Sequence, residues 1–160
     1  MYYTRFNTEI CEIILAGDKD GLKILHLNTG EGKRRFEIST DWEQNDSFFV
    51  TTIKQINEYL DGKLKTFKIR LSPEGTEFQK NVWSELQKIP FGEVRTYGEI
   101  AAALGNKSAA RAVGMSNSRN PIPLIIPCHR VIGSNGKLTG FAHGLTLKQR
   151  LLDIESGNSG

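Results

Sequence analysis

The sequence predicts an α/β N-terminal domain, built from a small antiparallel sheet and a helix, followed by a mainly α-helical C-terminal domain of winged helix-turn-helix-like form. Two observations predict this division. Strand-like apolar runs occur within the first 70 residues, whereas capped helices with apolar faces follow later. The segment Leu71-Ser72-Pro73 marks the boundary, because a proline disfavours helix in the residue before it. The predicted domains are residues 1–72 and 73–160.

The N-terminal part reads as strands followed by a helix. Ile10–Leu15 and Leu22–Leu27 are strand-like runs joined by a segment rich in glycine and aspartate. Residues 35–38 predict a third strand. Isoleucines and a leucine then recur at helical spacing until Gly62, which ends the predicted helix. We find no chemical motif in this part of the chain.

The C-terminal part reads as a series of short helices. Thr76 and Thr96 each begin a capping box, in which two side chains three residues apart satisfy free backbone amides. The second of these helices ends at Gly105, and its predicted inward residues are Ile100, Ala103 and Leu104. Ser108 is the predicted cap of a third helix over residues 109–115. Two short helices joined by a glycine-containing turn match a helix-turn-helix.

The second helix of this pair carries alanines around a single arginine, Arg111. It has few long polar side chains that could read bases in a major groove. Small residues permit close approach of the backbone, so this helix favours binding through backbone and shape. The alanines are equally compatible with tight packing against the first helix, and both interpretations can hold.

Charge is unevenly distributed along the chain. The formal net charge is +3, whereas residues 1–72 hold 11 basic and 11 acidic residues. Between Arg95 and Arg150, eight basic residues face one acid, Glu99. This imbalance suggests a polyanionic partner. A solvated basic surface is the alternative interpretation.

Composition indicates a soluble globular protein, with 38% hydrophobic and 24% charged residues. No run approaches the ~18 apolar residues of a membrane helix, and no apolar signal core follows the first residues. Cys11 and Cys128 are the two cysteines, so we expect no disulfide framework and a reducing, cytosolic setting. Cys11 fits a core thiol, and His26 fits a structural or surface histidine.

The possible chemistry is concentrated in an apolar, proline-rich run that leads to Cys128, His129 and Arg130. A thiol is a useful nucleophile as its thiolate, and its free pKa of roughly 8.5 falls near cations. Three prolines within residues 120–127 predict a rigid, extended connector that fixes the cysteine in place. Cys128 could be a nucleophile, a metal ligand or a buried bystander. A structural zinc site needs four ligands, and the remaining cysteine and histidines lack zinc spacing to it.

Several spaced segments of residues 73–156 together match the signature of one family. They are Pro127-Cys128-His129-Arg130-Val131, Phe91-Gly92-Glu93-Val94, Tyr97-Gly98-Glu99, Ala110-Arg111-Ala112-Val113-Gly114, Asn120-Pro121, and Leu151-Leu152 with Glu155. The chain thereby resembles the O6-alkylguanine-DNA alkyltransferase family (methylated-DNA–protein-cysteine methyltransferases). Its N-terminal part looks like the more variable α/β domain of that family.

This resemblance implies direct-reversal DNA repair. An alkyl (methyl) group would pass from O6 of guanine, and also from O4 of thymine, to Cys128, and each protein molecule would act once. His129 resembles the residue that deprotonates the cysteine through a bridging water, and Glu155 resembles the carboxylate that orients this histidine. Tyr97 resembles the tyrosine that gives a proton or hydrogen bond to the departing guanine.

The resemblance also implies how DNA is held. Arg111 resembles an arginine finger that fills the gap left by the rotated nucleotide. Asn120 matches an asparagine that braces the loop before the cysteine, and Arg130 fits a structural support. The other implied DNA or substrate contacts are Ser108, Ala110, Arg119, Phe141 and Ala142. Many members have Tyr-Ser where this chain has Phe141-Ala142, and several have a glycine in place of His143. We expect alkyl transfer to survive these differences and the tolerance of larger alkyl groups to differ.

The implied partner is double-stranded DNA containing O6-alkylguanine, bound through its minor groove with little sequence preference. The resemblance further implies a monomer without cofactor, metal or membrane contact, placed in the cytoplasm on the nucleoid. One alternative is an alkyltransferase-like protein that binds lesions without transfer, but those relatives lack the cysteine. A helix-turn-helix regulator is disfavoured by the alanine-rich helix. A cysteine hydrolase is the remaining alternative, and no oxyanion site can be inferred for it.

Overall fold

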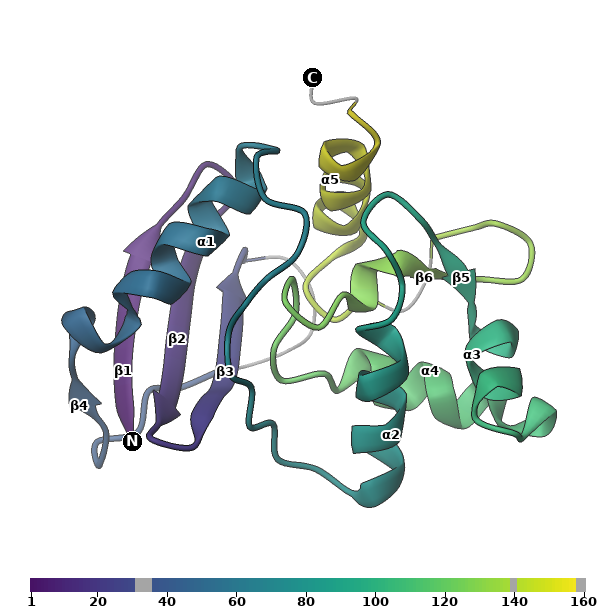
Figure 1. The fold of residues 1–160 in the computed structure, drawn as a ribbon, viewed down its shortest axis with the longest axis horizontal. Coiled ribbons are helices and arrows are strands. Elements are labelled where there is room, and N and C mark those ends of the chain that lie inside the picture. The colour runs from purple at the N-terminus through teal and green to yellow at the C-terminus, as the bar shows by residue number, and fades with distance from the viewer. Residues whose placement is uncertain (31–35, 139–140, 158–160) are drawn as a thin grey trace.

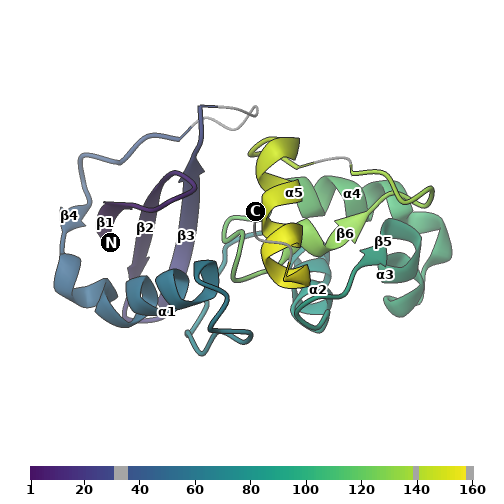
Figure 2. The same ribbon diagram turned by 90° about the horizontal axis from the view of Figure 1, so that it is seen from above.

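The computed structural model describes residues 1–30, 36–138 and 141–157, and it divides into a sheet-bearing N-terminal half and a helical C-terminal half (Figures 1 and 2). The strands are β1 (Tyr2–Asn7), β2 (Glu12–Asp18), β3 (Gly21–Asn28), β4 (Glu43–Gln44), β5 (Arg95–Thr96) and β6 (Val131–Ile132). The α-helices are α1 (Val50–Leu60), α2 (Glu77–Leu86), α3 (Tyr97–Ala103), α4 (Ala110–Ser118) and α5 (Leu145–Ser156). Three short 3-10 helices are η1 (Asp46–Phe49), η2 (Lys107–Ala109) and η3 (Cys128–Arg130).

The N-terminal sheet has the strand order β3-β2-β1-β4, and α1 lies across one of its faces (Figure 1). The pairs β1–β2 and β2–β3 are antiparallel, whereas β4 runs parallel to β1. The sheet is therefore mixed rather than purely antiparallel as predicted. The core beneath α1 combines alternate strand residues with the buried helix residues Ile56 and Tyr59; the strand residues are Ile13, Leu15, Leu25 and Leu27.

The sequence prediction finds β2, β3 and α1 but misses β1 and β4. The third predicted strand is wrong: Phe36, Glu37 and Ile38 form no strand, and Arg35 lies outside the described residues. Side chains hold this segment instead, because the Phe36 ring stacks on His26 with a centroid distance of 4.7 Å. His26 is buried, which fits the structural role expected of it.

After α1 the chain returns to the N-terminal sheet before it enters the C-terminal half. The backbone amide of Leu22 donates to the carbonyl of Arg70 at 2.9 Å, and the amide of Ser72 donates back to Leu22 at 2.8 Å. A further backbone bond joins the halves directly, from the amide of Leu25 on β3 to the carbonyl of Pro121 at 2.8 Å. The sheet edge thus holds the segment that leads to the cysteine.

The helix starts of the C-terminal half follow the predicted capping boxes. Thr76 caps α2 and Thr96 caps α3, each with both reciprocal hydrogen bonds. The prediction that Ser108 caps the next helix is wrong, because the side chain of Asn106 accepts from the amide of Ser108 at 3.2 Å and starts η2 instead. Helix α3 buries Ile100 and Ala101, whereas Ala103 is exposed, contrary to the prediction.

The proline-rich connector is compact rather than extended as predicted. The amide of Ile126 donates to the carbonyl of Ile122 at 2.9 Å, and Leu124 adopts a left-handed conformation with φ of 73°. Prolines exclude a regular ladder of backbone hydrogen bonds but are compatible with turns. The buried side chain of Asn120 completes the turn, since its amide group donates to the carbonyl of Ile126 at 2.7 Å.

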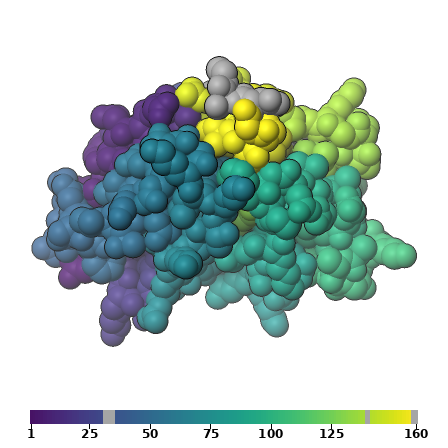
Figure 3. Space-filling view, turned by 45° about the horizontal axis from the view of Figure 1, so that its top comes forward, coloured from purple at the N-terminus to yellow at the C-terminus, as the bar shows by residue number. Residues whose placement is uncertain are grey.

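Helix α5 lies between the two halves, as the space-filling view also shows (Figures 2 and 3). Leu147 and Leu151 are buried on it, and Glu155 is buried near its C-terminal end. Gly157 ends the helix with a φ of 82°, a left-handed conformation that glycine adopts without strain. Within the described ranges, no helix has both the length and the apolar character needed to cross a membrane.

Candidate active site

Cys128 opens the short helix η3 directly after the compact connector. Its side chain is buried, with the residue 3% exposed. Asn117 on α4 donates from Nδ2 to the carbonyl of Cys128 at 3.3 Å, and the amide of Cys128 donates to Ile126 at 2.8 Å. Asn120 braces the same turn, because its Oδ1 accepts from the amide of Ile122 at 2.9 Å. Two asparagines therefore fix the backbone that presents the thiol.

The carboxylate of Glu155 gathers hydrogen-bond donors from three other segments of the chain. Its Oε1 accepts from Arg130 Nε at 2.8 Å and from the backbone amide of Gly92 at 3.1 Å. Its Oε2 lies 2.5 Å from His129 Nε2, 2.5 Å from the Tyr59 hydroxyl and 3.1 Å from Arg130 Nη2. The structure thus brings together His129, Glu155 and Arg130, and it adds Tyr59, which the sequence analysis missed.

Burial and pairing set the charges of this network. Burial alone would raise the pKa of Glu155, but its hydrogen bond and charge interaction with His129, with the hydrogen bonds from Arg130 and Tyr59, hold it well below 4.5. Burial lowers the pKa of His129 from its ordinary 6.5, although Glu155 opposes this. At neutral pH, Glu155 is therefore a carboxylate and His129 a neutral ring.

The neutral ring of His129 presents its two nitrogens to different surroundings. A carboxylate accepts hydrogen bonds and cannot donate them, so Nε2 carries the ring proton toward Glu155. The opposite nitrogen, Nδ1, is buried and has no hydrogen-bond partner within the described part of the chain. That nitrogen keeps a free lone pair, which makes it the basic atom of the ring.

Lys148 on α5 is a second residue that sequence reasoning missed. Its side chain is fully buried, and its Nζ donates to the carbonyl of Val131 at 2.6 Å. Burial lowers its pKa to about 8, and a negative charge on Cys128 opposes that shift. The interaction is reciprocal, so the ammonium form of Lys148 favours the thiolate of Cys128. A lysine is seldom buried, and the sequence gives no signal that this one is.

Tyr97 and Arg111 lie on the helix-turn-helix. Tyr97 is half-buried at the start of α3, with its ring beside Gly114 of α4, where an added Cβ would lie 3.8 Å from the ring. Arg111 is exposed on α4, Ala110 is half-buried, and Ser108 is exposed on η2. Further along, Arg119 is exposed at the end of α4. This arrangement leaves a surface of small residues flanked by arginines.

The basic residues counted in the sequence do not all face solvent. Arg130 and Lys148 are buried beside the reactive cysteine, so they cannot contact a polyanion at the surface. The exposed cations Lys107, Arg111 and Arg119 lie on η2 and α4 or at the end of α4. Of the eight basic residues, two are thus buried near the reactive cysteine and three are exposed around the helix-turn-helix, while Arg95, Lys137 and Arg150 lie elsewhere.

The segment Phe141–His143 attaches to the N-terminal half. Phe141 is buried against His143, with the ring centroids 5.7 Å apart, and Ala142 is half-buried. The backbone carbonyl of His143 accepts from the Thr29 hydroxyl at 3.0 Å. A ring nitrogen of His143 lies 3.3 Å from the carbonyl of Leu27 on β3. His143 thus ties this loop to the N-terminal sheet.

Comparison with known proteins gives a consistent result over the whole chain. A family model described as the ribonuclease-like domain of 6-O-methylguanine DNA methyltransferase matches residues 1–73. A second, described as the DNA binding domain of the same proteins, matches residues 77–157. The methylated-DNA–protein-cysteine methyltransferase of Methanosarcina acetivorans is 54% identical over 155 residues, which cover 97% of this chain and 98% of that protein. The constitutive enzyme of that name from Bacillus subtilis is 43% identical, and the match covers 96% of this chain and 94% of that protein.

A solved structure is similar over the same extent. The crystal structure of Mycobacterium tuberculosis OGT in complex with DNA superimposes with a TM-score of 0.90 at 41% identity. The match covers 99% of this chain and 95% of that protein.

Proposed function

The chain belongs to the 6-O-methylguanine DNA methyltransferase family, and we propose that it repairs DNA by moving an alkyl group from O6 of guanine to the sulfur of Cys128. The observation that carries this proposal is the buried network around Glu155, which contains His129, the residue that directly follows the buried Cys128. The site combines a thiol, a neutral histidine with a free Nδ1, and a carboxylate that holds the opposite ring nitrogen. Nucleophile, base and orienting group are thus present in one site.

The transfer proceeds as a displacement at the alkyl carbon. His129 takes the thiol proton on Nδ1 through a bridging water, and the thiolate is stabilised by Lys148. The sulfur then forms a bond to the methyl carbon as the bond from that carbon to O6 of guanine breaks. The bonding electrons return to the guanine, and Tyr97 supplies a proton or hydrogen bond to the departing base. The products are unmodified guanine and S-methylcysteine.

We propose that each protein molecule acts once. A thioether has no easy leaving group, and nothing in this set of side chains would regenerate the thiol. The same chemistry extends to O4 of thymine, where an alkyl group is likewise bound to an oxygen next to an aromatic ring. The name of the enzyme class, methylated-DNA–protein-cysteine methyltransferase, describes this reaction in the similar proteins.

The DNA partner is double-stranded and carries O6-alkylguanine. We propose that α4 enters the minor groove, because its small residues allow close approach and its exposed Arg111 can replace the rotated nucleotide. A closely similar protein has been crystallised with DNA. Binding by this surface depends on backbone contacts, so its affinity falls steeply with salt and varies little with sequence.

We also propose two functional domains, residues 1–72 and 73–160, in a monomer that works in the cytoplasm on the nucleoid. Asn120 supports the reactive segment from within the fold, since it is buried. For Phe141 and Ala142 we propose a place beside the alkylated base. A single Cys128 per chain is sufficient for the reaction, so a monomer is the simplest functional unit.

One experiment tests the proposed function. The protein is incubated with duplex DNA carrying a single O6-methylguanine, and its intact mass is measured with time. We expect the gain of one methyl group per protein molecule, with no gain for Cys128→Ser. Binding to the lesion without any change in mass would contradict the proposal and would support a lesion-binding protein.

A further inference from the structure

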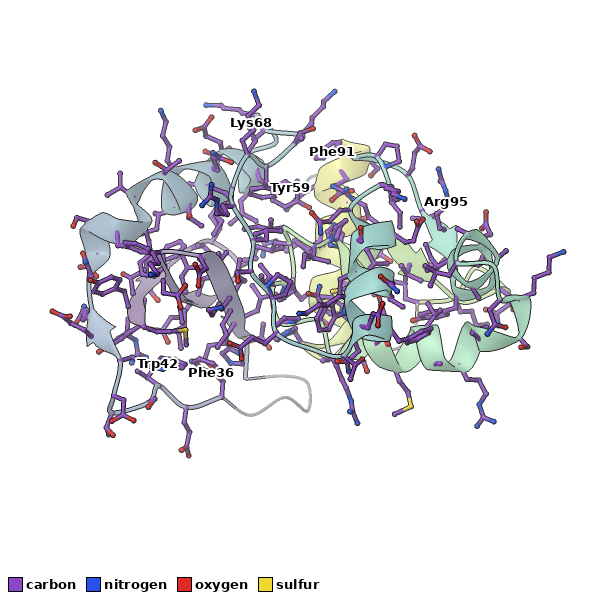
Figure 4. All side chains as sticks on the ribbon, turned by 60° about the horizontal axis from the view of Figure 1, so that its bottom comes forward. Phe36, Trp42, Tyr59, Lys68, Phe91 and Arg95 are labelled. Carbon is purple, nitrogen blue, oxygen red and sulfur yellow. The ribbon has the colours of Figure 1, made fainter. Side chains whose placement is uncertain are left out.

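The N-terminal half of the molecule reaches into the reactive network through one side chain, Tyr59. This residue lies in the last turn of α1 and is fully buried. Figure 4 labels Tyr59 and Phe91, which lie at the junction of the two halves, and their ring centroids are 6.1 Å apart. The ring centroid of Phe67 also lies 5.3 Å from that of Tyr59. Packing against two aromatic rings restricts the orientation of the Tyr59 side chain.

We propose that Tyr59 is a positioning residue of the alkyl-transfer reaction, through which the N-terminal half sets the proton affinity of His129. The inference rests on the proposed function above and extends it to a residue outside the C-terminal half. Its basis is the geometry of three buried polar groups. The hydroxyl of Tyr59 lies 2.5 Å from Glu155 Oε2 and 3.2 Å from His129 Nε2.

The proton positions in this cluster follow from the number of hydrogen-bond donors and acceptors that each group has. A phenol has one proton, and the carboxylate of Glu155 is the strongest acceptor within reach, so Tyr59 donates to Oε2. His129 donates from Nε2 to the same oxygen. The remaining lone pairs of the Tyr59 oxygen face the Nε2 proton, which adds a second acceptor to that proton. Both interactions favour the ring form whose Nδ1 is free.

Tyr59 also remains protonated over the working pH range. Burial, and then the negative charge of Glu155, raise its pKa well above the ordinary value of 10. The hydroxyl is therefore a constant donor to Glu155, and it withdraws part of the carboxylate's negative charge from His129. A carboxylate with fewer competing donors holds a proton on the imidazole more strongly.

Other charged or titratable groups also act on His129 in this buried cluster. Those that face it or interact with it are Glu155 and Lys148 from α5, Arg130 and Cys128 from η3, and Tyr59 from α1. Arg130 and Lys148 lower the pKa of His129 by their positive charge, whereas Glu155 raises it. Tyr59 is neutral, so its hydroxyl can be removed without changing the net charge of the cluster.

The substitution Tyr59→Phe removes the hydroxyl and keeps the aromatic packing. Glu155 then loses one of its donors and binds the imidazolium form of His129 more tightly, so the pKa of His129 rises. A protonated His129 cannot accept the thiol proton. The loss of activity should therefore be confined to pH values below the pKa of His129, where a rise of about half a unit lowers the reactive fraction by at most about threefold.

The matched control is Thr4→Val, which deletes a different buried hydroxyl from the same half. Thr4 donates to Asp46 at 2.7 Å and touches none of the reactive groups. Tyr59→Phe loses the hydroxyl's contacts with Glu155 and His129, and Thr4→Val loses one hydrogen bond, so both variants should lose thermal stability. The rate constant of methyl transfer is then measured under single-turnover conditions with saturating lesion DNA, from pH 4.5 to pH 8.5.

We expect Tyr59→Phe to transfer up to about threefold more slowly than the unmodified protein at the acid end of this range and within about twofold of it at pH 8. Thr4→Val should follow the unmodified protein at every pH. A pH titration of the His129 ring by 15N NMR, with His129→Asn to assign the signal, gives a readout independent of transfer. It should show a higher pKa in Tyr59→Phe.

The outcomes separate this inference from the function on which it rests. If the unmodified protein does not take up a methyl group, the proposed function fails. If it does, and the pH profile and the His129 titration of Tyr59→Phe superimpose on those of the unmodified protein, the role of Tyr59 is overturned. A uniform loss of rate at every pH would also overturn it, because that pattern indicates a structural contact between the halves.

Discussion

Replacing Arg130 with methionine removes the guanidinium that holds Glu155 and keeps most of the volume of the side chain. Arg130 makes three hydrogen bonds: Nε and Nη2 to Glu155 at 2.8 and 3.1 Å, and Nη1 to the carbonyl of Ile89 at 2.7 Å. The side chains of the ion pair are 8% and 1% exposed. The variant would therefore leave a carboxylate and a carbonyl inside the protein without these donors.

The expected cost follows from this burial. Removing one partner of a buried ion pair typically costs about 3–5 kcal/mol, a large share of the roughly 5–15 kcal/mol that stabilises a folded domain. For a chain of this length, each kcal/mol lowers the melting temperature by about 2–4 °C, so the predicted fall is about 6–20 °C. Arg130→Lys keeps the positive charge but loses the two-pronged contact of the guanidinium. Its melting temperature should lie between those of the unmodified protein and Arg130→Met.

A second arginine–glutamate ion pair, exposed at the surface, serves as the control for this measurement. Arg5 makes the same two-pronged contact with Glu12, at 2.9 and 2.8 Å, but these side chains are 49% and 22% exposed. Exposed ion pairs contribute little to stability and are screened by salt. Thermal unfolding of Arg130→Met and Arg5→Met is followed by circular dichroism at low and high salt.

We expect a large, salt-independent fall in the melting temperature for Arg130→Met and almost none for Arg5→Met. Equal melting temperatures for the two variants would refute the view that burial, rather than the shape of the contact, gives this ion pair its strength.

Three further predictions concern the reaction and its pH dependence. Arg111→Ala should slow methyl transfer from duplex DNA while leaving transfer from free O6-alkylguanine unchanged, because the arginine acts on the DNA helix; equal losses with both substrates would contradict this. Phe141→Tyr combined with Ala142→Ser should change the ratio of benzyl to methyl repair rates, and an unchanged ratio would show that these hydroxyls do not select the alkyl group. Since the pKa of Glu155 is lowered, its ionised form stabilises the fold above pH 4.5. The difference in melting temperature between the unmodified protein and Glu155→Gln should therefore shrink as the pH falls below 4.5, and a difference that grows would be contrary to this linkage.

The sequence predicts the local features that depend on neighbouring residues. Both capping boxes form as expected, because each requires only a threonine and an acceptor three residues later. The prediction of a strand near Phe36 fails, because the aromatic ring of that residue packs on His26 and its backbone does not join the sheet. Ser108 is predicted to cap the helix that follows it, but it lies inside η2, which Asn106 caps, and α4 begins directly after η2 without a side-chain cap.

The candidate site is predictable where the residues lie within one signature and is missed where they do not. Cys128 and His129 are adjacent in the sequence, and Glu155 follows from the family resemblance. Tyr59 is 70 residues from His129 and 96 from Glu155, so only the fold brings them together. Lys148 lies on α5, and its burial depends on how this helix packs between the two halves.

The most direct test of the central claim is to locate the transferred methyl group. The two cysteines provide the contrast, because Cys128 lies beside Lys148 and His129, whereas burial raises the pKa of Cys11 to about 11. After reaction with DNA carrying O6-methylguanine, the protein is digested and its peptides are sequenced by mass spectrometry. We expect S-methylcysteine at Cys128 alone, with full stoichiometry retained in Cys11→Ser. A methyl group on Cys11, or full uptake by Cys128→Ser, would contradict this expectation.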